Sequence, residues 1–120
     1  MIITFEIPQL PKTPNSIGKA SIWHSHNERK KWRMLVAFAL IKKVPSKPME
    51  KANITCTRFS SREPDLDNLF SSFKFVIDAI KNCGVIKDDK SSCISLKCNW
   101  QKSKPKEGKI KVEIEEVLNA

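Results

Sequence analysis

The chain has 120 residues, which is enough for one hydrophobic core and too few for two independent domains. Its 40% hydrophobic and 29% charged residues exclude a wholly disordered chain, and its 3 glycines exclude a collagen-like repeat. The longest uninterrupted apolar run, residues 34–41, is too short to cross a bilayer, and no basic leader precedes an apolar segment at the start. We therefore expect a single soluble domain in the cytoplasm.

The positive charge is confined to the first half of the chain. The formal net charge is +9 at pH 7; residues 1–62 contain 12 Lys and Arg against 3 Asp and Glu, whereas residues 63–120 contain 10 of each kind. This asymmetry indicates a polyanionic partner, of which nucleic acid is the simplest. The alternative is a solvated basic surface that keeps the domain in solution.

The first half of the chain predicts two strands that are separated by a long loop and a helix. Residues 2–7 have the composition of a strand, which Pro8 ends. Residues 8–22 contain three prolines and favour an extended loop. Residues 52–59 predict the second strand.

A helix is expected between these strands. Ser25 and Glu28 have the spacing of a capping box, so the helix should begin there and end near Val44, before a proline. Its buried face should consist of the apolar residues that recur at helical spacing: Trp32, Leu35, Val36, Ala39 and Leu40.

A second helix should begin within residues 64–68 and run to Asn82, with Gly84 as its left-handed terminator. Its apolar positions are Leu66, Leu69, Phe70, Phe73, Ile77 and Ile80. Its opposite face is polar and contains both signs of charge: Asp67, Ser71, Lys74, Asp78 and Lys81.

The last third of the chain predicts two more strands. Residues 92–100 and 109–117 alternate between apolar and polar, and residues 103–108 between them have the composition of a turn. We expect these strands to pair as an antiparallel C-terminal hairpin. The whole chain, residues 1–120, is then one small α+β domain with a mixed sheet of about four strands, two main helices and the order β-α-β-α-β-β.

The acidic residues near the start of the second helix have an unusual arrangement. Two carboxylates two positions apart point in different directions on a regular helix. Asp65 and Asp67 therefore converge only if the helix begins between them, and Pro64 favours this break because it suits a first turn and holds its predecessor extended. A third carboxylate, from Asp88 or Asp89, joins them only if the chain folds back along the helix.

Carboxylates gathered in this way would suit a divalent metal ion. Mg²⁺ prefers oxygen ligands and takes one or two carboxylates together with water and phosphate. Carboxylates brought together without a cation repel one another. With Mg²⁺ the site would polarise a DNA phosphate and help to deprotonate an attacking water. Lys74, on the same helix face, would stabilise the negative charge that develops.

Purely structural explanations remain open for the same residues. Aspartates at a helix start are common as caps, Asp-Asp pairs are common in turns, and Lys74 and Asp78 have the spacing of an ordinary ion pair. The four cysteines lack Cys-x-x-Cys spacing, which indicates reduced thiols. A zinc site is the alternative, and its ligands would come from Cys56, Cys83, Cys93, Cys98, His24 and His26.

The sequence resembles the RusA-type Holliday junction resolvases, small endodeoxyribonucleases of bacteria and their phages. The matching segments are Pro64-Asp65-Leu66-Asp67-Asn68-Leu69, Lys74, Asp78-Ala79-Ile80 and Gly84-Val85-Ile86-Lys87-Asp88-Asp89. The resemblance implies a homodimer that cuts four-way DNA junctions by paired symmetric nicks in recombination and repair. It implies Mg²⁺ as the cofactor, with Mn²⁺ as a substitute, and neither a nucleotide cofactor nor a membrane.

The resemblance also implies roles for individual residues. The metal-binding carboxylates would be Asp65, Asp67, Asp89 and Asp88, of which the first three are also catalytic. Lys74 would be the catalytic lysine. In the best-known pattern this lysine falls one turn after the second aspartate, where the present chain has Ser71, and Lys74 lies one turn later on the same face. Ser91 stands where the family usually has a polar residue after the Asp pair.

A homodimer suits a four-way junction, because its two equivalent sites face two opposed strands. Contacts that position the DNA are expected mainly from basic residues of the first half. The candidates are Arg29, Lys30, Arg33, Lys42, Lys43, Arg62 and Asn68.

Two other hypotheses stay open. One is a non-catalytic basic DNA-binding module, in which the acids only cap and turn the chain. The other is a RusA-like fold with degraded activity, because Lys74 is displaced. Uptake of Mg²⁺ or Mn²⁺ by the carboxylates separates a nuclease from the binding module.

Overall fold

The computed structural model describes residues 1–12 and 22–118 of the chain. Within these ranges the elements are, in order, β1 (Ile2–Ile7), α2 (Ile22–Ala39), β2 (Ala52–Ser60), α3 (Leu66–Ser72), α4 (Lys74–Asn82), β3 (Ile94–Lys102) and β4 (Lys109–Glu116). The predicted α+β class and element order are confirmed, with the second helix divided into α3 and α4. None of the described helices is long and apolar enough to cross a membrane.

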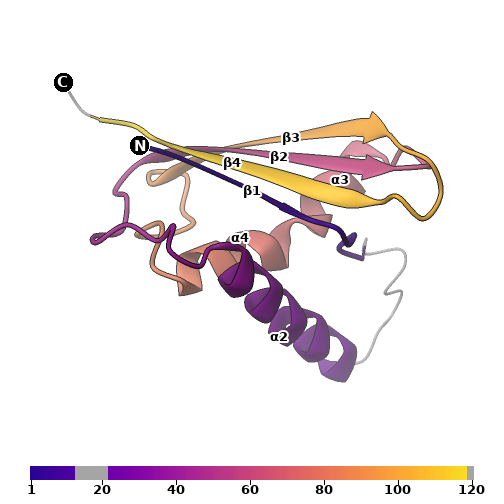
Figure 1. Ribbon diagram of the computed structural model, residues 1–120, viewed down its shortest axis with the longest axis horizontal. Coiled ribbons are helices and arrows are strands. Elements are labelled where there is room, and N and C mark those ends of the chain that lie inside the picture. The colour runs from indigo at the N-terminus through magenta and orange to yellow at the C-terminus, as the bar shows by residue number, and fades with distance from the viewer. Residues whose placement is uncertain (13–21, 119–120) are drawn as a thin grey trace.

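The strands form one mixed sheet with the order β1-β4-β2-β3. Strand β4 runs antiparallel to both of its neighbours, β1 and β2, whereas β3 runs parallel to β2. Figure 1 shows the helices together on one side of the sheet. Buried and exposed residues accordingly alternate along β1 and β4, so that one face of the sheet packs on the core and the other meets solvent.

The expected pairing of the last two strands as a hairpin is wrong. A short turn of residues 103–108 does join β3 to β4, and the two strands run in opposite directions, but β2 lies between them. Cys56 of β2 is opposite Cys98 on one side and Val112 on the other. The physical reason is the helical crossover through α3 and α4, which lets β3 pair parallel to β2. Alternation in the sequence identifies the buried face of a strand but not its neighbour.

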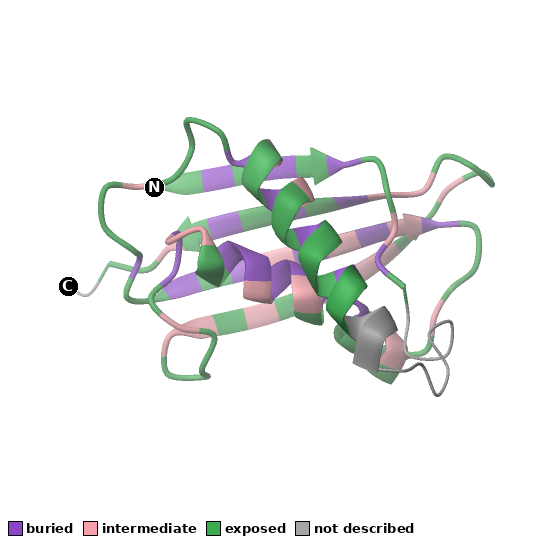
Figure 2. Ribbon diagram, turned by 90° about the horizontal axis from the view of Figure 1, so that it is seen from below, coloured by how far each residue is buried: buried purple, intermediate pink, exposed green. Residues whose placement is uncertain are grey.

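The core lies between the sheet and the helices, where α2 crosses the sheet (Figure 2). Trp32 and Val36 of α2, and Leu40 directly after its end, are completely buried at 0% exposure, which confirms the predicted face of this helix. In the second helical region the predicted face holds except at two positions of α3, because Leu66 and Phe70 are 73% and 45% exposed. Helix α3 therefore presents apolar side chains to solvent.

Helix α2 begins at Ile22, so the expected N-cap at Ser25 is wrong: Ser25 lies inside the helix. Glu28, the expected partner in the capping box, is buried and accepts a hydrogen bond from Trp32 Nε1 at 3.2 Å. The spacing that suggested a cap thus places a buried carboxylate one turn before an indole that donates to it.

Helix α2 ends at Ala39, earlier than the expected end near Val44. The following residues form a turn, in which the N–H of Lys43 donates to the carbonyl of Leu40 at 2.9 Å. Lys42 has a φ of 63°, a left-handed conformation that stops a helix. The chain therefore leaves the helix before the next proline restricts it.

The expected single helix up to Asn82 is interrupted at Phe73. This residue has φ −89° and ψ 0°, and its N–H bonds to the carbonyl of Phe70 at 3.1 Å, as in a tighter turn. Next to it, the hydroxyl of Ser72 donates to the carbonyl of Leu69 at 2.8 Å. Phe73 itself is 0% exposed, so burial of its ring accompanies the break.

Candidate functional site

Asp65 and Asp67 lie at the start of α3, as their spacing predicted. Asp65 is the N-cap residue with an extended backbone, φ −68° and ψ 166°, and its Oδ1 accepts a hydrogen bond from the N–H of Asn68 at 2.9 Å. Asp67 belongs to the first helical turn. Both side chains are exposed, and neither makes an ion pair with any other residue of the described ranges.

Hydrogen bonds hold the segment that leads into α3. The Ser60 hydroxyl at the end of β2 accepts from Trp100 Nε1 at 2.9 Å and donates to the carbonyl of Arg62 at 2.8 Å. The Ser60 carbonyl accepts from the N–H of Ser103 at 3.0 Å. Because Ser60 is buried, these bonds fix the lead-in of Asp65 to β3 and to the start of the β3–β4 turn.

A cavity of about 540 Å³ opens between this lead-in and the β3–β4 turn. Its charged and amide side chains are Arg58, Arg62, Glu63, Asp65, Asn68, Lys104 and Lys106, so basic groups outnumber acidic ones. Arg58 is buried and donates to the carbonyl of Pro11 at 2.7 Å, and burial lowers the pKa of its guanidinium. Asp65 thus stands at the edge of a basic cavity, together with two of the predicted DNA contacts, Arg62 and Asn68.

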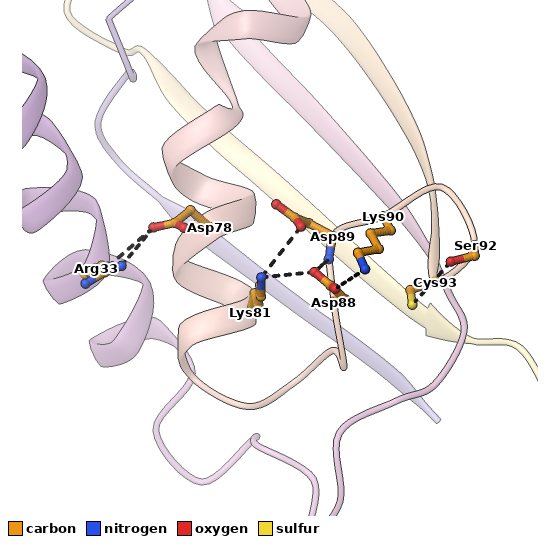
Figure 3. A network of polar contacts seen from close by, with 8 residues as sticks. All are labelled: Arg33, Asp78, Lys81, Asp88, Asp89, Lys90, Ser92 and Cys93. Carbon is orange, nitrogen blue, oxygen red and sulfur yellow. Dashed lines mark hydrogen bonds and ion pairs between the residues drawn. The ribbon is translucent and has the colours of Figure 1, made fainter.

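Asp88 and Asp89 form a separate acidic pair around Lys81 of α4 (Figure 3). Lys81 Nζ lies 2.9 Å from Asp88 Oδ1 and 3.8 Å from Asp89 Oδ1, and Lys90 Nζ lies 3.7 Å from Asp88 Oδ2. The hydrogen bond from Lys81, with another from the Asp89 N–H at 2.8 Å, holds the pKa of Asp88 well below its ordinary value. Lys81 therefore favours the ionised form of Asp88.

One chain does not bring the two acidic pairs together as the sequence suggested. Asp65 and Asp67 flank the start of α3, whereas Asp88 and Asp89 sit beside Lys81, near the end of α4. Among the described side chains, no three acidic, histidine or cysteine groups are close enough to hold one metal ion. The expected folding back of the loop along the helix is therefore incomplete within a single chain.

Lys74 is the first residue of α4 and is exposed. The alternative explanation, an ordinary ion pair between Lys74 and Asp78, is not what forms, because Asp78 Oδ2 lies 3.3 Å from Arg33 Nη2 of α2 (Figure 3). Because the helix is interrupted at Phe73, Asp67 lies on α3 and Lys74 on α4, and the spacing of one continuous helix no longer relates them. Lys74 thus keeps an ammonium without an acidic partner in the described part of the chain.

The predicted DNA contacts of the first half are all exposed, but several already have partners. Arg33 pairs with Asp78, Arg29 lies 5.5 Å from the ring centroid of Phe75, and Lys43 Nζ donates to the carbonyl of Thr4 at 2.9 Å. Lys30, Lys42 and Arg62 complete the predicted set. The four cysteines are free thiols, and the side chain of His24 lies outside the described residues.

Sequence reasoning missed the basic residues at the far wall of the cavity. Arg58 was hidden because it lies in a strand, and the two lysines because Lys104-Pro105-Lys106 was interpreted only as a turn. The signal in the sequence was the pair of lysines, Lys104 and Lys106, on either side of the turn proline.

The family model for endodeoxyribonuclease RusA matches residues 15–115. The chain belongs to the RusA endodeoxyribonuclease family. The matched range includes both acidic pairs, Lys74 and the cationic wall of the cavity, so family membership covers every residue of the candidate site. The RusA family comprises DNA endonucleases that act on Holliday junctions. A search of curated proteins gave no match.

Proposed function

We propose that this protein is a Mg²⁺-dependent endonuclease that resolves four-way DNA junctions by paired symmetric nicks during recombination and repair. The observation that carries the proposal is a pair of exposed carboxylates at the start of α3 in a RusA-family chain, of which Asp65 lines a basic cavity and Asp67 follows two residues later. We further propose that it acts in the cytoplasm of a bacterium, encoded by the cell itself or by a phage.

The chemistry of Asp65 and Asp67 fits a hard divalent cation. In a chain of net charge +9, neither carboxylate has a basic partner within the described ranges. The cap hydrogen bond occupies Oδ1 of Asp65 and leaves its other oxygen available. Oxygen donors of this kind are the ligands of Mg²⁺, with Mn²⁺ as a substitute. When bound, the ion supplies polarisation of the scissile phosphate and activation of a water molecule.

The remaining residues of the proposal act on the DNA. Lys74 would stabilise negative charge near the reacting phosphate, since its ammonium has no acidic partner. The exposed cations of α2, with Lys42, Lys43, Arg62 and Asn68, would hold the backbone in position. Asp88 and Asp89 would complete the metal ligands, which requires Lys81 to release them.

A homodimer supports this arrangement in two ways. The exposed side chains of Leu66 and Phe70 lie on α3 beside Asp67, and burial of apolar side chains drives subunit association. A twofold dimer also presents two equivalent sites, one for each opposed strand of a junction. We therefore propose that Asp88 and Asp89 approach Asp65 and Asp67 from the partner subunit.

Replacement of Asp67 by Asn tests the proposed function. Asp67→Asn should lower nicking of a labelled four-way junction in Mg²⁺ by roughly a hundredfold or more, because a neutral amide is a poor Mg²⁺ ligand. Binding of the junction in EDTA should stay within about twofold, since Asp67 donates nothing to a phosphate. Glu113→Gln on the open face of β4 is the matched control and should cut normally. Normal cutting by Asp67→Asn would refute the site, and binding without cutting by the unmodified protein would indicate a non-catalytic module.

A further inference from the structure

The β3–β4 turn holds a lysine in a conformation that favours glycine. The N–H of Glu107 donates to the carbonyl of Lys104 at 3.1 Å, which closes a four-residue turn with Pro105 and Lys106 in the centre. Lys106 has a φ of 69°, the left-handed value that the third position of a type II turn requires. Glycine or asparagine is usual there, and lysine adopts it only at a cost in stability.

The turn is fixed against the lead-in to α3. At its start, the N–H of Ser103 donates to the carbonyl of Ser60 at 3.0 Å. At its end, Gly108 packs so closely on Leu10 that an added Cβ would lie 2.6 Å from Leu10 Cδ1. Both walls of the cavity are thus held in place, and the two lysines of the turn line the same cavity as Asp65.

Three exposed cations beside this cavity have no acidic partner in the described part of the chain. Lys104, Lys106 and Arg62 are exposed and make no ion pair with any residue in the ranges 1–12 and 22–118. Elsewhere Lys81 pairs with Asp88 and Arg33 with Asp78. The cavity is lined by four basic side chains and by two acidic ones, Glu63 and Asp65, so positive charge exceeds negative charge and favours an anion.

We propose that Lys104 and Lys106, together with Arg62, bind backbone phosphates of the DNA strand that enters the cleavage site beside Asp65. The inference rests on the proposed function and adds the β3–β4 turn to the DNA-binding surface. The lysines act as positioning residues, since ammonium groups on a phosphate fix the register of a strand without reading its bases. This role would explain the strained backbone of Lys106, because that conformation puts the lysine side chain at the cavity.

The first test removes the two charges and measures junction binding in EDTA at several salt concentrations. Each lost phosphate contact lowers the slope of log affinity against log salt by about 0.9. The Lys104→Gln/Lys106→Gln variant should therefore bind the junction more weakly than the unmodified protein. The ratio of the two affinities should fall about tenfold as the salt concentration rises from 50 to 200 mM. Lys111→Gln, on the open face of β4, is the matched single-charge control and should change the slope little.

The second test separates binding from folding. Lys106→Gly should have a melting temperature at or above that of the unmodified protein, because glycine tolerates the left-handed conformation. The same variant should nonetheless lose junction affinity and nick more slowly in Mg²⁺. A stable Lys106→Gly protein that binds and cuts normally would overturn the inference.

The outcomes distinguish this inference from the proposed function. If the unmodified protein cuts junctions and Asp67→Asn does not, but the two lysine variants behave normally, only the inference fails. If the unmodified protein never cuts in Mg²⁺ or Mn²⁺, the proposed nuclease fails, while a changed salt slope still supports the phosphate site.

Discussion

Asp65 combines a structural and a chemical property in one side chain. Its Oδ1 caps α3 through the N–H of Asn68, while its position at the cavity edge makes it a candidate metal ligand. A cap needs only an acceptor oxygen, whereas a ligand for Mg²⁺ needs a negative charge. The two properties can therefore be separated by substitution.

Asparagine and alanine at position 65 should behave differently in folding and alike in catalysis. Asp65→Asn keeps the acceptor, so the free energy of unfolding should change by less than about 0.5 kcal/mol, while Asp65→Ala should lose about 1 kcal/mol. Both variants should lose Mg²⁺-dependent nicking. Urea denaturation and junction cleavage measure the two properties. Cleavage by Asp65→Asn at the normal rate would show that Asp65 is only a cap.

Residue 64 explains why this part of the site could be predicted from sequence. Pro64 acts over one or two positions, and the resulting helix start between Asp65 and Asp67 depends on no distant contact. The relation of Asp89 to these residues depends on how the chain beyond α4 folds, and the proposed site extends this dependence to a second subunit. No local pattern in the sequence contains that information.

At the scale of elements, the predictions were correct where the spacing of apolar residues determines which face of a helix is buried. The buried face of α2 follows from a repeat of three and four residues. No helix-breaking residue accounts for the break at Phe73, because neither Gly nor Pro is present between Leu66 and Asn82. Packing of the Phe73 ring into the core accompanies a conformation that helix propensity alone would not select. The order of strands likewise depends on the crossover through α3 and α4.

Truncation of Phe73 should test the importance of its burial at this break. Phe73→Ala should lower the free energy of unfolding by about 3–5 kcal/mol, because the ring is fully buried. Phe38→Ala is the matched control, since the Phe38 side chain is 78% exposed on α2, and it should change stability by less than about 0.5 kcal/mol. Urea denaturation of both variants gives the comparison. Equal effects would mean that burial of Phe73 does not stabilise the junction between α3 and α4.

At the scale of the whole molecule, the charged surface is uneven. The open face of the sheet carries acids such as Glu6, Glu113 and Glu115 among its exposed residues. Arg62, Lys104 and Lys106, which make no ion pair within the described ranges, line the cavity at the end of β2, next to α3. DNA should therefore approach the edge of the domain where α3 begins, which is also where Leu66 and Phe70 are exposed.

A proposed site that joins two subunits makes a prediction that a site within one chain does not. Asp67→Asn and Asp89→Asn homodimers should each be inactive, because every site lacks one carboxylate. In a mixed dimer, however, one site would contain both substitutions and the other would contain neither. Mixing the two variants should therefore restore nicking of one strand, up to the fraction of mixed dimers formed.

The mixing experiment has a direct control in the dimer itself. Leu66→Glu places a charge on the exposed apolar surface of α3, so it should weaken association, which analytical ultracentrifugation measures. The same substitution, introduced into both inactive variants, should abolish the recovered nicking. If the mixed variants stay inactive although ultracentrifugation shows that they exchange subunits, Asp67 and Asp89 do not meet across the dimer, and the proposed ligand set would be wrong.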